Sequence, residues 1–183
     1  LFTDGRYTVQ AKAETDTSLF EISLSPRTQI ADWIATHLAK GQTLGFDPWL
    51  HTGTEIGRIT AALNAKSIKI KPLSKNPIDQ IWGKARPKPP SGQVTIQPET
   101  LAGRSAQEKI ATIQKQLKDE GQHAAILTLP DSICWLFNIR GGDVARTPLP
   151  LGEAILRSDG SADLFLADEK VSGELKQWLG NEV

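Results

Sequence analysis

Histidine and cysteine are the side chains that most often bind transition metals or act as nucleophiles, and this sequence contains few of them. The three histidines, His37, His51 and His123, stand far apart, and Cys134 is the only thiol. No two of them have the i,i+4 or Cys-x-x-Cys spacing of a zinc site, so these residues predict no metal centre. Cys134 lies in an apolar segment, where a thiol packs as a small hydrophobic group.

Carboxylates are a second set of side chains that could bind a metal ion or act in catalysis. Asp4 and Asp47 each follow an apolar stretch typical of a strand, and α/β proteins commonly place their sites at strand ends. Two such aspartates would suit a metal-dependent nuclease, but a two-metal site needs more converging carboxylates than the sequence offers. We favour the interpretation that both residues cap turns, as aspartate routinely does.

Two short polar segments remain as candidates. Asp4-Gly5-Arg6-Tyr7 follows the first apolar residues, and Arg140-Gly141-Gly142-Asp143 follows an apolar helical pattern. The second segment lacks the glycine spacing of phosphate-binding loops. Arg140 could pair with Asp143 or with a neighbouring carboxylate, and either pairing would fix a tight turn. Neither segment builds a catalytic site alone.

Alternating strand and helix patterns must position these segments. In the first half, the hydrophobic pattern predicts strands at 20–24, 43–46 and 68–70, and helices at 30–38, 52–63 and 78–82. The first helix is expected to start at Ser25-Pro26. Thr52 and Glu55 have capping-box spacing at the start of the second.

The alternation resumes in the second half. Ser105 and Glu108 form a capping box for a helix that Gly121 ends. Ala124–Leu129 is continuously apolar, which predicts a central strand buried on both faces. The remaining expected elements are a strand at 94–96, a helix at 132–137 capped by Asp131, a hairpin around Ser158-Asp159-Gly160 and a last helix starting at Asp168. Strands alternating with helices predict an α/β fold.

A proline-rich segment, Pro87–Gly92, separates the two halves. Its prolines favour extended conformation, so we predict a first domain at 1–86, a linker at 87–92 and a second domain at 93–183. Leu1–Arg6 resembles Leu164–Lys170, since in both an apolar stretch precedes an acidic and then a basic residue. If the domains are duplicates, the first lacks its N-terminal strands and the second its C-terminal half. Because the sequence also contains no methionine, we expect a part of a longer protein.

The amino-acid composition argues against several classes of function. The chain has 21 basic and 21 acidic side chains and a net charge of zero, which argues against a general nucleic-acid binder. No apolar run approaches the ~20 residues needed to cross a bilayer, so we expect no membrane partner. A single cysteine suits a reducing compartment and predicts a cytoplasmic protein.

Several segments resemble the N-terminal domains of Xaa-Pro aminopeptidases, members of the creatinase/prolidase superfamily. The most specific is the long run Asp131–Val144, followed by Pro148. The others are Leu1–Tyr7 with Gln10-Ala11, Gly45–Trp49, Ile81-Trp82 with Arg86-Pro87, and Gly103-x-Ser105-x-x-x-Lys109.

The resemblance implies a parent protein with two related α/β domains, each a mixed sheet flanked by helices, followed by a pita-bread catalytic domain. In the family, that catalytic domain binds two divalent metals, usually manganese, through two Asp, two Glu and one His. It hydrolyses the first peptide bond of substrates with proline second. None of those ligand motifs occurs in the sequence, so we expect this chain to be inactive alone, without a cofactor. The peptide substrate would bind to the missing domain.

The resemblance also implies roles for the candidate residues. The non-catalytic domains wall one side of the active-site cleft, and Arg6 would lie toward that cleft and orient a peptide carbonyl or carboxylate. An ion pair of Arg6 with Asp4 or another acid is an equally weighted alternative. Arg140 and Asp143 are expected to hold the loop or an interdomain contact. The family often forms homodimers, so the parent is expected to do so.

Two other functions remain open. The chain could be a binding module of the same fold that works without a hydrolase. It could also belong to a prolidase-like dipeptidase or a creatinase-like hydrolase, although the linker and the Asp131–Val144 run favour the aminopeptidase. An Asp, Asp, His, Glu, Glu series beyond Val183 would distinguish the enzyme from the binding module.

Overall fold

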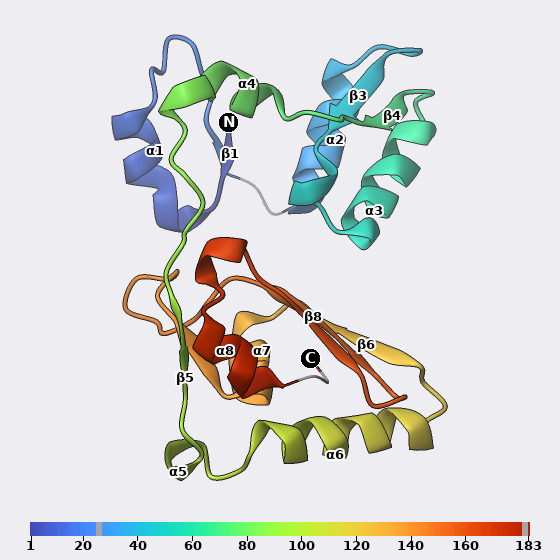
Figure 1. Cartoon of the computed structure of the whole chain (residues 1–183). Helices are drawn as coiled ribbons and strands as arrows, with labels where there is room; N and C mark the ends of the chain where they lie inside the picture. Colours follow the sequence, from blue (N-terminus) through green and yellow to red (C-terminus); the bar gives the residue numbers. More distant parts are fainter. Residues whose placement is uncertain (25–26, 181–182) are drawn as a thin grey trace. The chain divides into compact units, whose positions relative to one another are not determined.

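The computed structural model describes residues 1–24, 27–180 and 183. The chain divides into two compact units, Leu1–Arg86 (unit 1) and Pro87–Val183 (unit 2). Each unit combines short helices with small sheets (Figure 1), which confirms the predicted α/β alternation. None of the helices in the described ranges has the length and apolar character that a bilayer crossing requires.

Unit 1 contains two separate parallel strand pairs. β1 (Phe2–Thr3) pairs with β2 (Ser23–Leu24), and β3 (Thr43–Phe46) pairs with β4 (Lys69–Pro72). The other elements are η1 (Gly5–Tyr7), α1 (Thr8–Glu14), α2 (Arg27–His37), η2 (Pro48–Leu50), α3 (Gly53–Asn64), α4 (Pro77–Trp82) and η3 (Gly83–Ala85).

The sequence predicted most elements of unit 1. The Thr52 hydroxyl accepts a hydrogen bond from the Glu55 backbone N–H and starts α3. Ile59 and Leu63 from its predicted stripe lie in a small core. The predicted strand at 20–24 is too long, because only Ser23 and Leu24 pair with β1. The predicted helix start at Ser25-Pro26 lies outside the described residues.

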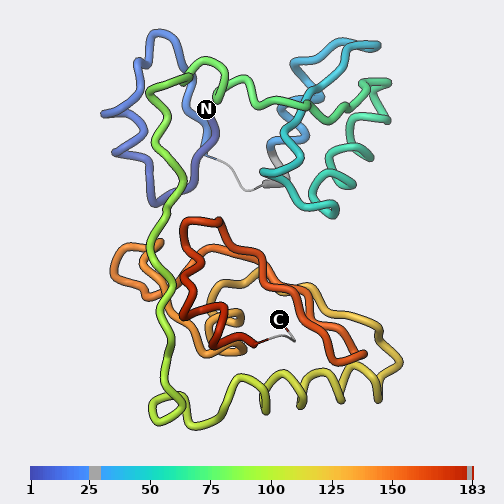
Figure 2. Tube along the Cα trace, in the orientation of Figure 1, coloured from blue at the N-terminus to red at the C-terminus, as the bar shows by residue number. Residues whose placement is uncertain are grey.

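Unit 2 contains two antiparallel sheets. β5 (Val94–Ile96) pairs with β7 (Ile139–Gly141), and β6 (Ala124–Leu127), β8 (Glu153–Arg157) and β9 (Ala162–Phe165) form a three-stranded sheet in that order. The other elements are α5 (Glu99–Ala102), α6 (Ala106–Asp119), α7 (Pro130–Phe137), η4 (Asp168–Lys170) and α8 (Gly173–Leu179). The path of the chain through them can be followed in Figure 2.

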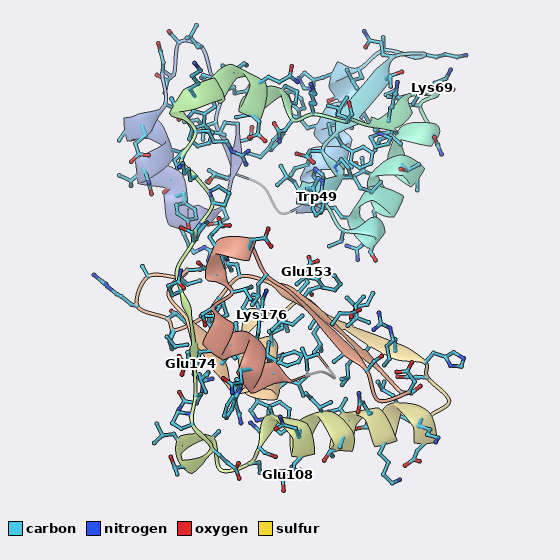
Figure 3. All side chains as sticks on the ribbon, viewed as in Figure 1. Trp49, Lys69, Glu108, Glu153, Glu174 and Lys176 are labelled. Carbon is cyan, nitrogen blue, oxygen red and sulfur yellow. The ribbon has the colours of Figure 1, made fainter. Side chains whose placement is uncertain are left out.

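The core of unit 2 lies between the three-stranded sheet and helices α6, α7 and α8. Its fully buried members include Ile133, Phe137, Ile139, Leu156 and Leu175. The capping box predicted at Ser105 and Glu108 is present in full at the start of α6 (Glu108 is labelled in Figure 3). The predicted hairpin forms β8 and β9.

Three predictions for unit 2 are wrong. Asp131 does not cap the helix predicted at 132–137, because α7 starts at Pro130 and Asp131 lies inside its first turn. The strand predicted to be central, β6, pairs with β8 alone and lies at an edge, with Ile126 73% exposed. A continuous apolar run indicates burial on both faces only when neighbouring segments supply the cover, and the described residues supply it on one side. The last helix is capped by the Ser172 hydroxyl and not by Asp168, which begins η4 instead.

Candidate functional site

The first candidate site is the turn that follows β1. The Asp4 carboxylate accepts hydrogen bonds from the Arg6 backbone N–H at 2.9 Å, and from Nε and Nη2 of its guanidinium at 3.1 and 2.7 Å. Asp4 therefore caps η1 and binds both edge donors of Arg6. The guanidinium also lies 5.6 Å from the centre of the Tyr7 ring. This arrangement fixes the guanidinium while leaving the Arg6 side chain 80% exposed.

Charge and hydrogen bonding reinforce each other in this turn. The Arg6 side-chain and backbone hydrogen bonds lower the pKa of Asp4 to about 2. The same carboxylate raises the pKa of Arg6 above its ordinary value. Asp4 is thus ionised and Arg6 positively charged at any physiological pH, and the ion pair predicted as one of the two roles of Arg6 is present.

Among the described residues, Asp47 and His37 make their contacts outside this turn. Asp47 caps η2 through the Trp49 backbone N–H and accepts a hydrogen bond from Asn76 Nδ2 at 2.7 Å. His37 stacks on Trp33 with 3.7 Å between ring centres. Among the described residues, no three His, Cys, Asp or Glu side chains come together in a way that could hold a metal ion. The two metals implied for the parent therefore find no ligand set in the described part of this chain.

The second candidate site centres on Asp143, whose carboxylate is fully buried. It accepts hydrogen bonds from the backbone N–H groups of Gly92 and Leu151, at 2.8 and 2.6 Å, and forms an ion pair with Lys170 at 2.5 Å. Lys170 Nζ also donates to the Leu151 carbonyl oxygen. The Asp143 carboxylate thus joins three segments: the end of the proline-rich segment at Gly92, the residues just before β8 at Leu151, and η4.

Hydrogen bonding also controls the charge of Asp143. Burial alone raises its pKa, but the hydrogen bonds from Lys170, Leu151 and Gly92 outweigh this effect and hold the pKa below its ordinary value. The Asp143 carboxylate is therefore ionised, and its ion pair with Lys170 is almost without solvent, since the Lys170 side chain is 4% exposed.

The glycines of this loop allow the close approach. A Cβ at Gly141 would lie 2.6 Å from the Pro150 backbone nitrogen, and a Cβ at Gly92 would lie 2.6 Å from the Gly142 carbonyl carbon. Neither distance is compatible with any larger residue, so Gly141 and Gly92 are required by packing and not by a phosphate ligand.

Arg140 does not pair with Asp143. Its Nη1 donates to the carbonyl oxygens of Ile139 and Cys134, at 2.8 and 3.4 Å. Lys170, and not Arg140, forms the ion pair with Asp143. The pairing with Asp143, one of the two considered for Arg140, is therefore wrong, and a residue 27 positions away from Asp143 supplies the positive charge. The sequence held one signal for Lys170, because it ends the segment that resembles Leu1–Arg6.

A second buried lysine was also missed. Lys109 is 2% exposed, and its Nζ donates to the Asn138 Oδ1 at 2.5 Å and to the Trp135 carbonyl oxygen at 2.8 Å. Asn138 has the left-handed conformation that ends α7, so Lys109 fixes the entry to β7. Burial, with the nearby charges of Arg104 and Arg140, lowers the pKa of Lys109.

Cys134 has the packing role that its apolar neighbours predicted. The residue is 3% exposed, and burial raises the pKa of its thiol. A protonated, buried thiol is a poor nucleophile.

The described residues thus form a pair of α/β units with ordered polar turns, and no group of metal-ligating side chains is assembled among them. Family models of the creatinase/prolidase N-terminal domain match residues 1–81 and, separately, residues 85–183. The chain belongs to the creatinase/prolidase N-terminal domain family.

Relatives with similar sequences are fungal proteins named probable Xaa-Pro aminopeptidase P. The protein from Talaromyces stipitatus is 36% identical and that from Paracoccidioides lutzii 33% identical, each over the whole of this chain. The chain spans only 28% and 30% of their respective lengths.

A solved structure has the same fold. It is X-prolyl aminopeptidase from Caenorhabditis elegans, described as a cytosolic enzyme with a di-nuclear active site. The TM-score is 0.85 at 26% sequence identity, and the match covers 97% of this chain and 29% of that one.

Proposed function

We propose that this chain is the non-catalytic N-terminal portion of a metal-dependent Xaa-Pro aminopeptidase, which removes the first residue from peptides with proline second. One observation carries the proposal: the whole chain matches proteins named Xaa-Pro aminopeptidase P, in which it accounts for less than a third of the length. This match supports the aminopeptidase over the two alternatives, a stand-alone binding module of the same fold and the N-terminal part of a prolidase- or creatinase-type hydrolase.

The role proposed for these units is to shape and restrict the entrance to the active site. The described residues hold no metal ligand set, so metal binding and bond cleavage would belong to another part of the protein. The di-nuclear site described for the C. elegans enzyme supports two divalent metals in the parent, and manganese is our proposal for both. A cytoplasmic location and a homodimeric parent complete the proposal.

Arg6 is the residue through which unit 1 would contact the peptide. Asp4 binds Nε and one N–H of Nη2, so the opposite edge of the guanidinium keeps donors for a second acceptor. A guanidinium already held by a carboxylate loses little conformational entropy when it binds a peptide carbonyl or carboxylate. Exposure and a fixed orientation together support this role.

The first experiment tests the activity of the full-length protein. We expect cleavage of an Xaa-Pro peptide that a chelator abolishes and Mn²⁺ restores, with no cleavage by residues 1–183 alone. Tight, stoichiometric Mn²⁺ binding to residues 1–183 in calorimetry would contradict the proposal, as would a full-length protein without aminopeptidase activity.

The second experiment tests Arg6 in the same full-length protein. We expect Arg6→Ala to lower kcat/KM while leaving the melting temperature nearly unchanged. Arg58→Ala, at another exposed arginine of unit 1, is the matched control and should change neither quantity. Unchanged kinetics for Arg6→Ala would assign Arg6 to the turn alone.

A further inference from the structure

Helix α2 carries an aromatic pair that lies outside the core of unit 1. Ala31, Ile34 and Leu38 of this helix pack in that core. Trp33 and His37 lie four residues apart on a neighbouring face, where Trp33 remains 39% exposed. Their rings stack with an angle of 15° between the planes. A large aromatic side chain in this position is available to contact a second element.

Trp33 contacts the first strand, and His37 restrains its ring. The Phe2 ring of β1 meets the indole edge-on, with 5.4 Å between ring centres and 85° between the planes. His37 Nδ1 donates to the Trp33 carbonyl oxygen at 2.7 Å, which holds the imidazole over the indole. Aromatic pairs of both geometries are favourable. Trp33 therefore connects β1 to α2.

The backbone pairing of β1 is short, so a side-chain contact matters to its position. Phe2 and Thr3 pair with Ser23 and Leu24, which is two residues of each strand. Two strands alone are at best marginally stable in water. A contact with a helix adds the restraint that so short a ladder lacks. The Phe2–Trp33 contact is therefore placed to hold β1 against α2.

The position of β1 bears directly on Arg6. Asp4 continues the extended backbone of β1, with φ −97° and ψ 174°. Alternate side chains of an extended segment point to the same side, so the direction of the Phe2 ring sets that of the Asp4 carboxylate. Asp4 in turn binds both Nε and Nη2 of Arg6. A chain of contacts therefore runs from α2 to the guanidinium.

We propose that Trp33 is a positioning residue for Arg6. Trp33 holds the Phe2 ring, and the extended backbone from Phe2 to Asp4 passes this restraint on to the guanidinium. The inference rests on one part of the proposed function, the contact of Arg6 with the peptide. Trp33 itself does not touch the peptide, so its effect on the reaction passes through Arg6.

Backbone dynamics test the restraint without any activity. In this chain we expect NMR order parameters of about 0.85 for the N–H groups of residues 4–7, falling to about 0.6 or below in Trp33→Leu. Trp33→Phe keeps an aromatic ring for Phe2 and should stay close to the natural chain. Trp49→Leu, at a 90% exposed tryptophan of the same unit (labelled in Figure 3), is the matched control and should change nothing in this turn. Mobile residues 4–7 in the natural chain, or unchanged values in Trp33→Leu, would overturn the proposal.

Kinetics of the full-length protein test the link to Arg6. Trp33→Leu should lower kcat/KM about three- to tenfold, the range expected for the loss of one aromatic contact, and Trp33→Phe should recover most of this loss. In an Arg6→Ala background, Trp33→Leu should have no further effect, because the side chain that it positions is gone. Equal losses with and without the Arg6 side chain would overturn the proposal, since Trp33 would then act independently of Arg6.

The two measurements separate this inference from the proposed function. Lower order parameters in Trp33→Leu, together with unchanged kinetics for Arg6→Ala, would reject the contact of Arg6 with the peptide and keep Trp33 as the residue that holds the turn. A loss of kcat/KM in Arg6→Ala without a loss in Trp33→Leu would reject this inference and keep the proposed function.

Discussion

Unit 1 and unit 2 each place a basic residue in a short 3-10 turn directly after a strand, and the two residues differ in surroundings. Arg6 in η1 binds Asp4, two positions away, and both side chains are largely exposed. Lys170 in η4 binds Asp143 from a distant loop, and both side chains are buried. Similar local sequence has therefore produced a surface turn in one unit and an internal crosslink in the other.

Burial determines how much each ion pair contributes to the stability of the fold. An exposed ion pair adds little to stability, because water solvates both charges when the pair is broken. A buried pair is different, since removing one partner leaves the other charge without solvent or counter-ion. The Asp4–Arg6 pair is thus suited to presenting a guanidinium, and the Asp143–Lys170 pair to holding the segments of unit 2 together.

Asp143→Asn is the substitution expected to have the largest effect. It leaves the buried Lys170 ammonium without a negative partner and should destabilise unit 2 by about 3–5 kcal/mol. Urea unfolding, monitored through the exchange of core amides in α7, measures this loss. Asp4→Asn is the matched control and should leave the unfolding of the chain nearly unchanged. Equal effects of the two substitutions would remove the distinction between the pairs.

A double-mutant cycle with Lys170→Met isolates the interaction itself. Each single substitution strands one buried polar group, whereas the double variant strands neither charge. The double variant should therefore be more stable than the sum of the two losses predicts, with a coupling free energy of about 1–3 kcal/mol. Additive losses would show that Asp143 acts through Gly92 and Leu151 and not through Lys170.

The pH dependence of stability should follow Asp143 in the acid range. Its pKa in the folded chain lies below the unfolded value of about 3.9. Its contribution is therefore complete above that unfolded value and is lost as the pH falls through the folded pKa. The difference in unfolding free energy between the natural chain and Asp143→Asn should shrink below about pH 4. A difference that stays constant down to pH 2.5 would contradict this assignment.

Local signals explain what the sequence predicted and what it missed. Thr52 and Ser105 lie within three residues of the backbone groups they cap, so α3 and α6 could be predicted from spacing alone. Asp143 could be singled out as an unusual polar residue. The sequence marked Lys170 only as the end of the segment that resembles Leu1–Arg6. It could not identify Lys170 as the partner of Asp143, because the contact depends on how β9 and η4 fold back against the loop. The edge position of β6 was missed for a similar reason, since it depends on which strands lie beside it.

The smallest expected effect concerns the exposed pair and needs a site-specific measurement. Arg6→Gln removes the charge and the two guanidinium hydrogen bonds, so the pKa of Asp4 should rise from about 2 toward its ordinary value of about 3.9. Carbon-13 NMR titration of the Asp4 carboxyl measures this change. Asp16, whose carboxylate accepts hydrogen bonds from Ser18, is an internal reference whose pKa should not move. Because both side chains are exposed, the urea midpoint should remain almost the same.

A shifted Asp4 pKa with an unchanged urea midpoint would show that the turn holds Arg6 in place without contributing to the stability of the fold. This is how a residue presented for binding should be held. An unshifted pKa would mean that the backbone N–H of residue 6, which the substitution retains, is what keeps Asp4 ionised.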